Sequence, residues 1–459
     1  MTELRRLREA FDTAPTSTYR KRNIGQGITE HVGLKIRDAS DRRRRPDRLP
    51  WGRCSMSSAL APRPAKANNG LGSFGSASVL PGDSPDERPG INEIALRLEV
   101  HTEPGAFVAL GDEWDALVER CGGGLQYRHG FMRLWREHFA PGETLRVLTQ
   151  RTSDGSLTAA LPLLLRRTRI YGVPVRELSA MANVHSGRFD LLAENPPEAA
   201  RVFLGVLLEQ ADWDVLRLID VPKGGAAEAL LDAAGLAGLR SGRWASMNSP
   251  YIDLPASWSE MEQTLSSHFR ANMRRRRRRL SEMGAVSTDL CDGSDPAVLR
   301  ARLDEGLQLE AEGWKGRGGT AISQASDTLE FYTALARQAG CEGQLRLWFL
   351  RLNGQAIAFQ FGLQDGTRYL LLKPTYDEAH GAVAPGHLLM EKVLQDCIAR
   401  GLLEFDFLGP GMRWKSDWAS KDRPHAWLYL FRGPRGRIVH GLKFRAAPMV
   451  RALLAGWNR

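Results

Sequence analysis

From residue 91 onward, apolar and polar positions alternate with two different periods, and this pattern predicts a folded α/β region. Apolar residues at every second position indicate strands, and apolar residues three or four positions apart indicate helices. The first part of this region predicts strands at 94–100, 144–150, 157–166, 175–178, 189–192 and 215–219, and helices at 114–120, 130–139, 197–210 and 225–234. We expect this mixed unit to end near residue 254.

A second run of elements follows with a similar order. Its helices are predicted at 258–269, 270–283, 296–310, 327–340 and 386–400, and its strands at 285–290, 344–352, 356–363, 369–373, 403–407 and 427–431. Asn353-Gly354 and Asp365-Gly366 separate three of these strands and are strong hairpin signals, because both dipeptides accept positive φ. The shared order predicts an α/β (α+β) fold with two tandem mixed-sheet domains, at 91–254 and 255–435, and a C-terminal extension at 436–459.

Residues 1–90 have a different composition. They contain the run Arg42-Arg43-Arg44-Arg45, many Pro, Gly, Ser and Ala residues, and no sustained period. Such a segment buries too little apolar surface to offset its conformational entropy. We therefore predict a disordered basic tail, with a functional basic arm as the alternative.

The charge distribution argues against nucleic acid as the main partner. The chain has a formal charge of +10, but residues 1–90 hold 17 Lys+Arg against 10 Asp+Glu, which leaves 46 against 43 for the remainder. The five cysteines are scattered without a CxxC pair, so neither a disulfide framework nor a metal site is predicted. The longest apolar run, at 159–165, is far too short to cross a bilayer. We expect a cytoplasmic protein, for which peripheral membrane contact remains open.

The residues that most strongly suggest chemistry lie near the C-terminus. Pro385-Gly386-His387-Leu388 opens an apolar helix, and a helix start presents free backbone N–H groups that favour an anion such as phosphate. The alternative is an ordinary helix start with Pro in the first turn. Tyr376 precedes this turn, Asp406 ends the next strand, and Lys415 follows soon afterwards.

These residues belong to a set of motifs that resembles a known family. The set comprises Arg274 to Arg279 with Leu280, Trp314-Lys315-Gly316, Gly319 to Ile322, Gly354 to Ala358, Tyr376-Asp377, Pro385 to Leu389, Asp406 to Gly409, Trp414-Lys415 and Trp418. In order and spacing it resembles the CelD-like or BioF2-like acetyltransferase module of bacterial proteins for cellulose and exopolysaccharide biosynthesis. That module belongs to the GNAT superfamily and is similar to the FemAB peptidoglycan aminoacyltransferases, which have two GNAT-like halves.

The resemblance implies two tandem GNAT-like domains with the active site in the second. It also implies acyl-CoA, with acetyl-CoA as the expected donor, as co-substrate and no metal. Pro385, Gly386, His387 and Leu388 would then bind the donor. The Gln/Arg-x-x-Gly-x-Gly/Ala loop of many GNAT enzymes has no clean copy here.

Acyl transfer also needs a base, a group that stabilises the oxyanion, and an acid for the leaving thiolate. Asp406 is the predicted base, because partial burial at the end of an apolar strand would raise its pKa; capping of the following loop is its alternative role. Lys415 would stabilise negative charge, or it is simply a solvated lysine. Tyr376 is the predicted acid, or it is a buried structural tyrosine.

Two further groups concern the acceptor. Trp314, Lys315 and Arg317 combine an aromatic face with two cations on one loop, and together with Trp414 they are the predicted substrate-binding residues. The six consecutive arginines at 274–279 point in all directions on a helix, so most of them are expected to form a solvated face, although several could meet an anionic ligand.

The sequence therefore predicts an acyltransferase that acts on an amine or hydroxyl of a sugar-containing cell-envelope or exopolysaccharide precursor. Two alternatives stay open. One is FemAB-type transfer from aminoacyl-tRNA, and the other is a non-catalytic binding protein that retains the fold.

Overall fold

The computed structural model describes residues 96–319 and 321–449. The tail predicted at 1–90 and the last residues of the predicted extension lie outside these ranges. Within them, the strands form one sheet in the order β1 (Arg97–His101), β2 (Thr144–Arg151), β3 (Leu157–Ile170), β4 (Val173–Ala180), β6 (Val215–Pro222), β13 (Lys421–Phe431), β7 (Arg240–Asp253), β12 (Glu404–Asp406), β11 (Arg368–Tyr376), β10 (Gln355–Asp365), β9 (Leu345–Leu352) and β8 (Val286–Cys291), with β5 (Leu192–Ala193) beside β3.

The two ends of this sheet repeat one topology. In the first half, β1 to β4 are antiparallel neighbours, and β6 follows helix α5 (Pro196–Gln210) to lie parallel to β4. In the second half, β8 to β11 are antiparallel neighbours, and β12 follows helix α12 (Pro385–Ala399) to lie parallel to β11. The expected mixed α/β fold with two similar halves is therefore confirmed.

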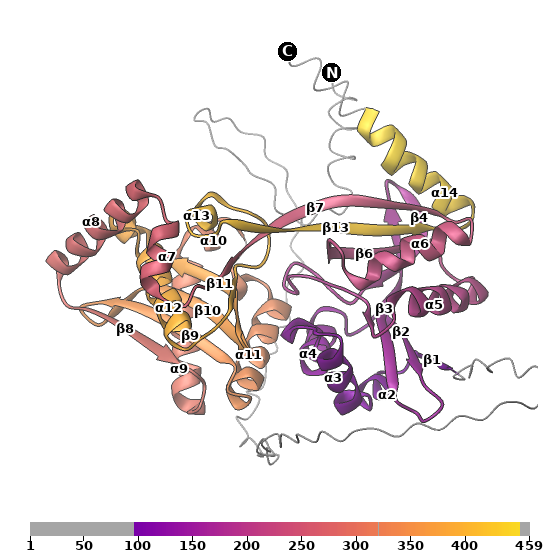
Figure 1. The fold of residues 1–459 in the computed structure, drawn as a ribbon, viewed down its shortest axis with the longest axis horizontal. Helices are drawn as coiled ribbons and strands as arrows, with labels where there is room; N and C mark the ends of the chain where they lie inside the picture. Colours follow the sequence, from indigo (N-terminus) through magenta and orange to yellow (C-terminus); the bar gives the residue numbers. More distant parts are fainter. Residues whose placement is uncertain (1–95, 320, 450–459) are drawn as a thin grey trace, which may run out of the picture. The chain divides into compact units, whose positions relative to one another are not determined.

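The halves exchange their last strands. β7 follows the first half in sequence but pairs with β12, whereas β13 follows the second half but pairs with β6. The two exchanged strands also pair with each other in antiparallel fashion from Arg240 and Phe431 to Tyr251 and Lys421 (Figure 1). Each half of the sheet is thus completed by a strand from the other part of the chain.

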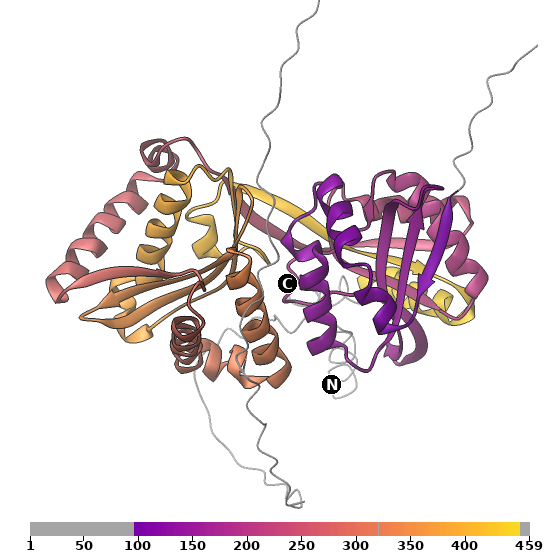
Figure 2. The ribbon, with the colours of Figure 1, turned by 90° about the horizontal axis from the view of Figure 1, so that it is seen from below.

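Helices cover both faces of the sheet (Figure 2). Those in the first half are α2 (Pro104–Val108), α3 (Gly111–Arg120), α4 (His129–Phe139), α5 and α6 (Ala229–Leu236). Those in the second half are α7 (Trp258–Thr264), α8 (Ser267–Met283), α9 (Pro296–Glu312), α10 (Trp314–Arg317), α11 (Ser326–Cys341), α12 and α13 (Arg413–Ser416), and α14 (Gly433–Gly441) follows β13. Short 3₁₀ segments lie at Leu125–Tyr127, Ala226–Glu228, Ile322–Gln324 and Glu378–Val383, and a π-helical turn lies at Leu442–Ala446.

Strand β10 shows how the second half is packed. Phe359, Phe361 and Leu363 belong to one apolar cluster with residues of α9 and α11, while Ala358 belongs to a second cluster with residues of α8 and α12. Alternating side chains of a strand point to opposite faces of its sheet. The helices α9 and α11 therefore cover one face of the second half, and α8 and α12 cover the other.

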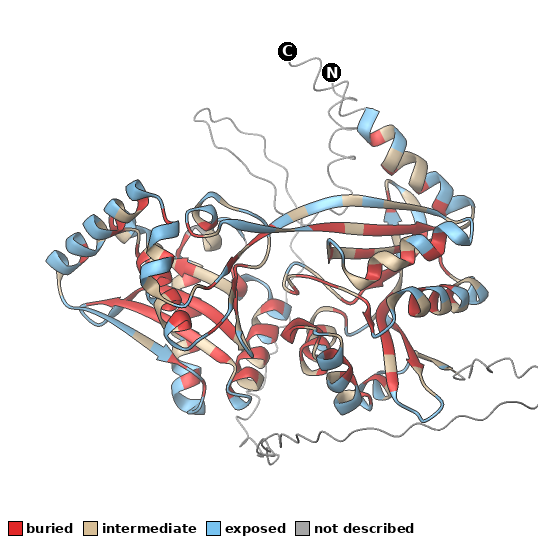
Figure 3. Ribbon diagram, in the orientation of Figure 1, coloured by how far each residue is buried: buried red, intermediate tan, exposed pale blue. Residues whose placement is uncertain are grey.

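The structure departs from the pattern in two places. The predicted helices at 258–269 and 270–283 meet earlier than expected, because the Ser266 side chain accepts a hydrogen bond from the Phe269 N–H and caps α8. The second departure is strand β7, which has fourteen residues and was not predicted. Its residues before Ser249 are exposed or half-buried and show no alternation (Figure 3).

The cysteines differ from one another. Cys121, Cys291 and Cys397 are free, whereas Cys341 is disulfide-bonded, although no disulfide was predicted for that residue.

Candidate active site

The parallel strands of the second half separate at their carboxyl ends. β11 and β12 pair only from Arg368 and Glu404 to Leu370 and Asp406. β11 continues to Tyr376 along β10, whereas the chain after β12 turns away through Leu408 and Gly409, both at positive φ. Beyond Leu370, one edge of β11 is therefore left without a strand partner, and α12 begins beside this opening.

A cavity of about 570 Å³ occupies the opening. Its wall is built from α8, α10, α11, β10, β11, the start of α12, the segment 407–415, and the first-half loop at 184–187. Four cationic side chains line it, namely Arg276, Lys315, Lys373 and Lys415, and none of its lining residues in the described chain is Asp or Glu. Its charge balance favours an anionic ligand.

The start of α12 lies in the cavity wall with Gly386 and His387. The N–H groups of His387 and Leu388 donate to the Ala384 carbonyl, at 3.0 and 3.3 Å. Pro385 has no N–H, so within the described residues the Gly386 N–H is the donor of this first turn that has no acceptor. Gly386 lies against the Tyr376 ring, since a Cβ built on it would be 3.4 Å from the ring carbon Cδ1.

His387 is held as a neutral side chain. Its Nδ1 accepts a hydrogen bond from the Trp418 indole at 3.0 Å, which leaves the ring proton on Nε2. Burial lowers the pKa of His387, and the nearby Arg276 guanidinium lowers it further. Of the predicted donor-binding residues, Gly386 and His387 line the cavity, whereas Pro385 and Leu388 are buried behind it.

Arg276 reaches the cavity from α8. Most of this helix is exposed, and three apolar side chains, Phe269, Met273 and Leu280, fix it on the second half. One of the six consecutive arginines therefore points into the site while its neighbours Arg275 and Arg277 remain exposed. The position of Arg276 within the helical repeat could have been used to find it, because it lies three residues after Met273.

Lys415 lines the cavity from the segment after β12. Its Nζ donates to the carbonyls of Leu408, at 2.5 Å, and Pro410, at 3.0 Å. Burial lowers the pKa of Lys415 to about 8, although Asp406 acts in the opposite direction. Lys415 thus fixes the 408–410 turn through two hydrogen bonds.

Asp406 lies behind the cavity and does not line it. The residue is fully buried, and its Oδ2 accepts from Arg188 and, at 2.8 Å, from Arg423, while its Oδ1 accepts from the Leu408 N–H at 2.9 Å. Both oxygens of this carboxylate therefore already accept hydrogen bonds within the protein, and the residue is not part of the cavity lining. This geometry favours the alternative in which Asp406 caps the turn and positions it, and we do not assign it as the base.

Of the remaining predicted site residues, some line the cavity and others do not. Tyr376 and Trp414 line the cavity, and so does Lys315, whose Nζ also donates to Glu310 at 2.7 Å and to the Pro374 carbonyl at 2.8 Å. Arg317 instead forms an exposed ion pair with Glu378 outside the cavity. The side chain of Trp314 lies outside what the structure describes.

Several residues in the wall were not predicted from the sequence. His185 stacks on Phe139, with ring centroids 5.2 Å apart, and its Nδ1 lies 3.3 Å from the Tyr332 hydroxyl. Burial lowers the pKa of His185 to about 3, and Lys373 adds to this effect. Gln360, which is almost fully buried, has no hydrogen-bond partner for either side-chain atom in the described chain. These residues are far apart in the sequence and come together only in the folded structure, so no local sequence signal marks them.

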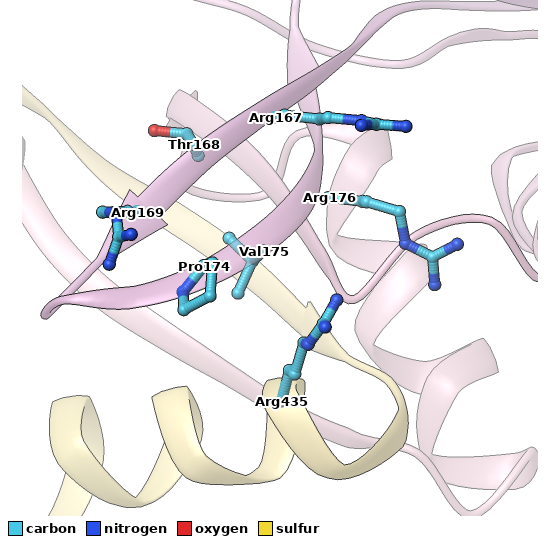
Figure 4. Close-up of a pocket in the computed structure, with 7 residues that line it drawn as sticks. All are labelled: Arg167, Thr168, Arg169, Pro174, Val175, Arg176 and Arg435. Carbon is cyan, nitrogen blue, oxygen red and sulfur yellow. The ribbon is translucent and has the colours of Figure 1, made fainter.

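A second hollow, of about 710 Å³, lies on the first half of the sheet (Figure 4). Arg167, Arg169 and Arg176 from the β3–β4 hairpin and Arg435 from α14 surround it. Arg176 pairs with Asp214 at 3.4 Å. The hollow contains no side chain suited to act as an acid or base in acyl transfer, so the cavity beside α12 is the better candidate active site.

One model of a known protein family matches part of the chain. Residues 267–416 match the family described as "Acetyltransferase (GNAT) domain". The match runs from the first residue of α8 to the last residue of α13, and so includes β11, α12, β12 and Lys415. About a third of the chain therefore matches the model of this acetyltransferase family. None of the curated proteins matches the chain.

Solved structures with a similar fold include FemX, at 12% identity and a TM-score of 0.49, with 76% of this chain and 99% of that chain covered. A tandem GNAT protein from the clavulanic acid biosynthesis pathway matches at 14% identity and a TM-score of 0.39, covering 73% and 98%. L-PGS from Bacillus licheniformis matches at 12% identity and a TM-score of 0.44, covering 74% and 96%. Similarities this distant carry no argument about activity.

The described residues contain no group of three His, Cys, Asp or Glu side chains placed to hold a metal ion. None of the helices in the described ranges has both the length and the apolar composition that a bilayer crossing requires.

Proposed function

We propose that the protein transfers an acyl group, most simply acetyl, from acyl-CoA to an amine or hydroxyl group. The observation that carries this proposal is the cationic cavity at the point where β11 and β12 separate, with the start of α12 in its wall. The CelD-like and BioF2-like resemblance of the motifs supports a sugar-containing precursor of the cell envelope or an exopolysaccharide as the acceptor.

The donor would lie on the α8 and α12 side of the sheet. There the Gly386 N–H and the Arg276 guanidinium offer the contacts that a diphosphate requires. The unpaired edge of β11 beyond Leu370 offers backbone groups to the amides and the thioester carbonyl of the donor. Lys415 supplies positive charge near the same opening, where negative charge would develop on the carbonyl oxygen.

The acceptor would enter from the opposite side, where first-half residues complete the wall. His185 lines the cavity there, and its ring, which burial keeps neutral, could hydrogen-bond the attacking amine or hydroxyl. Tyr332, hydrogen-bonded to His185, would hold the ring in place. Tyr376, beside Gly386, remains our proposed acid for the departing thiolate.

Calorimetric titration of the full chain with acetyl-CoA tests this proposal. Arg276→Met should weaken binding by about tenfold to a hundredfold, because a charged hydrogen bond to a phosphate is lost. Arg275→Met is the matched control, since it removes the same charge from an exposed neighbour on the same helix. Absence of acetyl-CoA binding by the wild-type chain, or equal weakening in both variants, would overturn the proposal.

A further inference from the structure

The cavity has a second wall, on the α9 and α11 face of the sheet, that the donor contacts do not use. Lys373 lies there, with its Nζ 5.4 Å from the centre of the Tyr332 ring on α11. Arg276 and the α12 start lie on the opposite face. Lys373 is therefore separate from the donor contacts proposed above.

A β-bulge places Lys373 on this face. Phe361 pairs with Lys373 and Gly362 pairs with Leu371, so Leu372 has no partner across the strand pair. Tyr369 and Leu371 belong to the apolar cluster of α8 and α12, and strict alternation would add Lys373 to that face. The extra residue instead turns Lys373 toward the face of Phe361, as bulges near active sites commonly re-aim a side chain.

The charges on this wall are incompletely balanced. Glu310, which is buried, accepts from Lys315 with one oxygen and from the Ile322 N–H with the other. In the part of the chain that the structure describes, the Lys373 ammonium group forms no hydrogen bond and no ion pair. Burial and the charge of Lys315 lower the pKa of Lys373 to about 8, which reflects the cost of holding this cation here.

A buried hydroxyl group on the same strand also lacks a partner. Thr375 is 5% exposed, lines the cavity, and its Oγ1 has no hydrogen-bond partner in the described residues. Thr375 pairs with Phe359 across the strands, so its side chain lies on the same face as Lys373. A cation and a hydroxyl donor without partners, two positions apart, form a built site for an anionic oxygen.

We propose that Lys373 and Thr375, beside Lys315, bind an anionic group of the acceptor, either a phosphate ester or a carboxylate. This inference rests on the proposed function, since it names the acceptor class for the same reaction. The anionic group anchors the acceptor on the α9 and α11 face and leaves its amine or hydroxyl free to reach the opening between β11 and β12.

The test is calorimetric titration of inorganic phosphate, and separately of acetate, into the full chain saturated with acetyl-CoA, so that the donor contacts are already occupied. Phosphate binding should weaken at least tenfold in Lys373→Met, whereas Lys392→Met, an exposed lysine on α12, should leave it unchanged. Binding of phosphate but not acetate would assign a phosphorylated acceptor, and the reverse would assign a carboxylate.

Thr375→Val keeps the shape of the side chain and removes its hydroxyl group, so it should weaken the same anion severalfold and serves as the second variant if Lys373→Met fails to fold. Equal phosphate and acetate affinities in wild type, Lys373→Met and Thr375→Val, or no binding of either anion to the acetyl-CoA complex, would overturn the inference. Failure of acetyl-CoA itself to bind would instead count against the proposed function.

Discussion

The two halves of the sheet share one topology but differ at the start of the helix between their parallel strands. In the first half, α5 begins with Pro196-Pro197 and has Glu198 in its first turn, so two N–H groups are absent and a carboxylate already occupies the positive end of the helix. In the second half, α12 begins with Pro385-Gly386 and has no acidic residue in its first turn. The second start therefore lacks both features that would oppose an external anion, in keeping with our proposal.

The two halves also differ in whether the cations beside their parallel strands are paired with carboxylates. In the first half, Arg217 pairs with buried Glu177 at 2.7 Å, so the cation is neutralised within the protein. In the second half, the cations lining the cavity include Arg276 and Lys373, and no carboxylate lines the same wall. The topology places a helix start beside the parallel strands in both halves, and on our proposal the residues at that start determine which half binds a ligand.

The largest expected effect concerns the ion pair that joins the halves. Arg188 comes from the first half and Asp406 from the second, and both are buried. Asp406→Asn should lower the free energy of unfolding by about 3–5 kcal/mol, because it removes the charge that compensates a buried guanidinium. Urea unfolding followed by circular dichroism measures this loss.

Asp422→Asn, an exposed aspartate on β13, is the control and should change stability by no more than about 0.5 kcal/mol. If Asp406→Asn unfolds like the wild type yet abolishes acetyl transfer, then Asp406 acts as the base after all, and our positioning role for it is wrong.

The proposed difference between the two helix starts can be tested by giving α12 the first residues of α5. The double substitution Gly386→Pro with His387→Glu recreates the Pro-Pro-Glu sequence of the first half. It removes the Gly386 N–H and adds a carboxylate, so acetyl-CoA affinity should fall about a hundredfold by calorimetry. The helix itself should persist, because Pro and Glu are both tolerated in a first turn.

Gly386→Ala alone is the matched control, since it keeps the N–H at position 386, adds no carboxylate and places its Cβ 3.4 Å from the Tyr376 ring, so it should retain most of the affinity. Unchanged acetyl-CoA binding by the double variant would show that the helix start does not contact the donor.

The elements of the second half were largely predictable because their signals are local. Asn353-Gly354 and Asp365-Gly366 mark the hairpins, and Pro385-Gly386 marks the start of α12. The strand exchange left no such signal, since β7 is mostly exposed and its pairing with β12 joins residues far apart in sequence. Periodicity reports which side of an element is buried, but it does not report which element covers that side.

The candidate site was predicted in part for the same reason. Gly386, His387 and Lys415 lie beside local motifs, and the structure places all three in the cavity wall. The bulge at Leu372 could not be predicted, because Tyr369 to Leu372 is continuously apolar and shows no break in period. The pairing of Asp406 with Arg188 joins residues 218 positions apart, so no window of sequence contains it.

The smallest expected effect concerns the cost of keeping Lys373 charged. Its pKa in the folded protein, about 8, lies below the ordinary lysine value of 10.5, because burial and Lys315 disfavour the cation more than Glu310 stabilises it. At pH 7 Lys373 is protonated in both the folded and the unfolded state, and its burial as a cation destabilises the folded state. Lys373→Met should therefore raise the free energy of unfolding by about 1–3 kcal/mol in urea titrations at pH 7.

The stability difference between the wild type and Lys373→Met should also change with pH in a defined direction. Between pH 8 and 10.5 the unfolded wild type binds more protons at this position than the folded protein does, so wild-type stability gains from rising pH. The advantage of Lys373→Met should then shrink toward zero near pH 10, while the exposed control Lys392→Met should show no such trend. An advantage that stays constant with pH, or a variant that is less stable at pH 7, would mean that Lys373 is already stabilised within the protein. The cavity would then have no unbalanced cation to offer an acceptor, and the second half would resemble the first more closely than we argue.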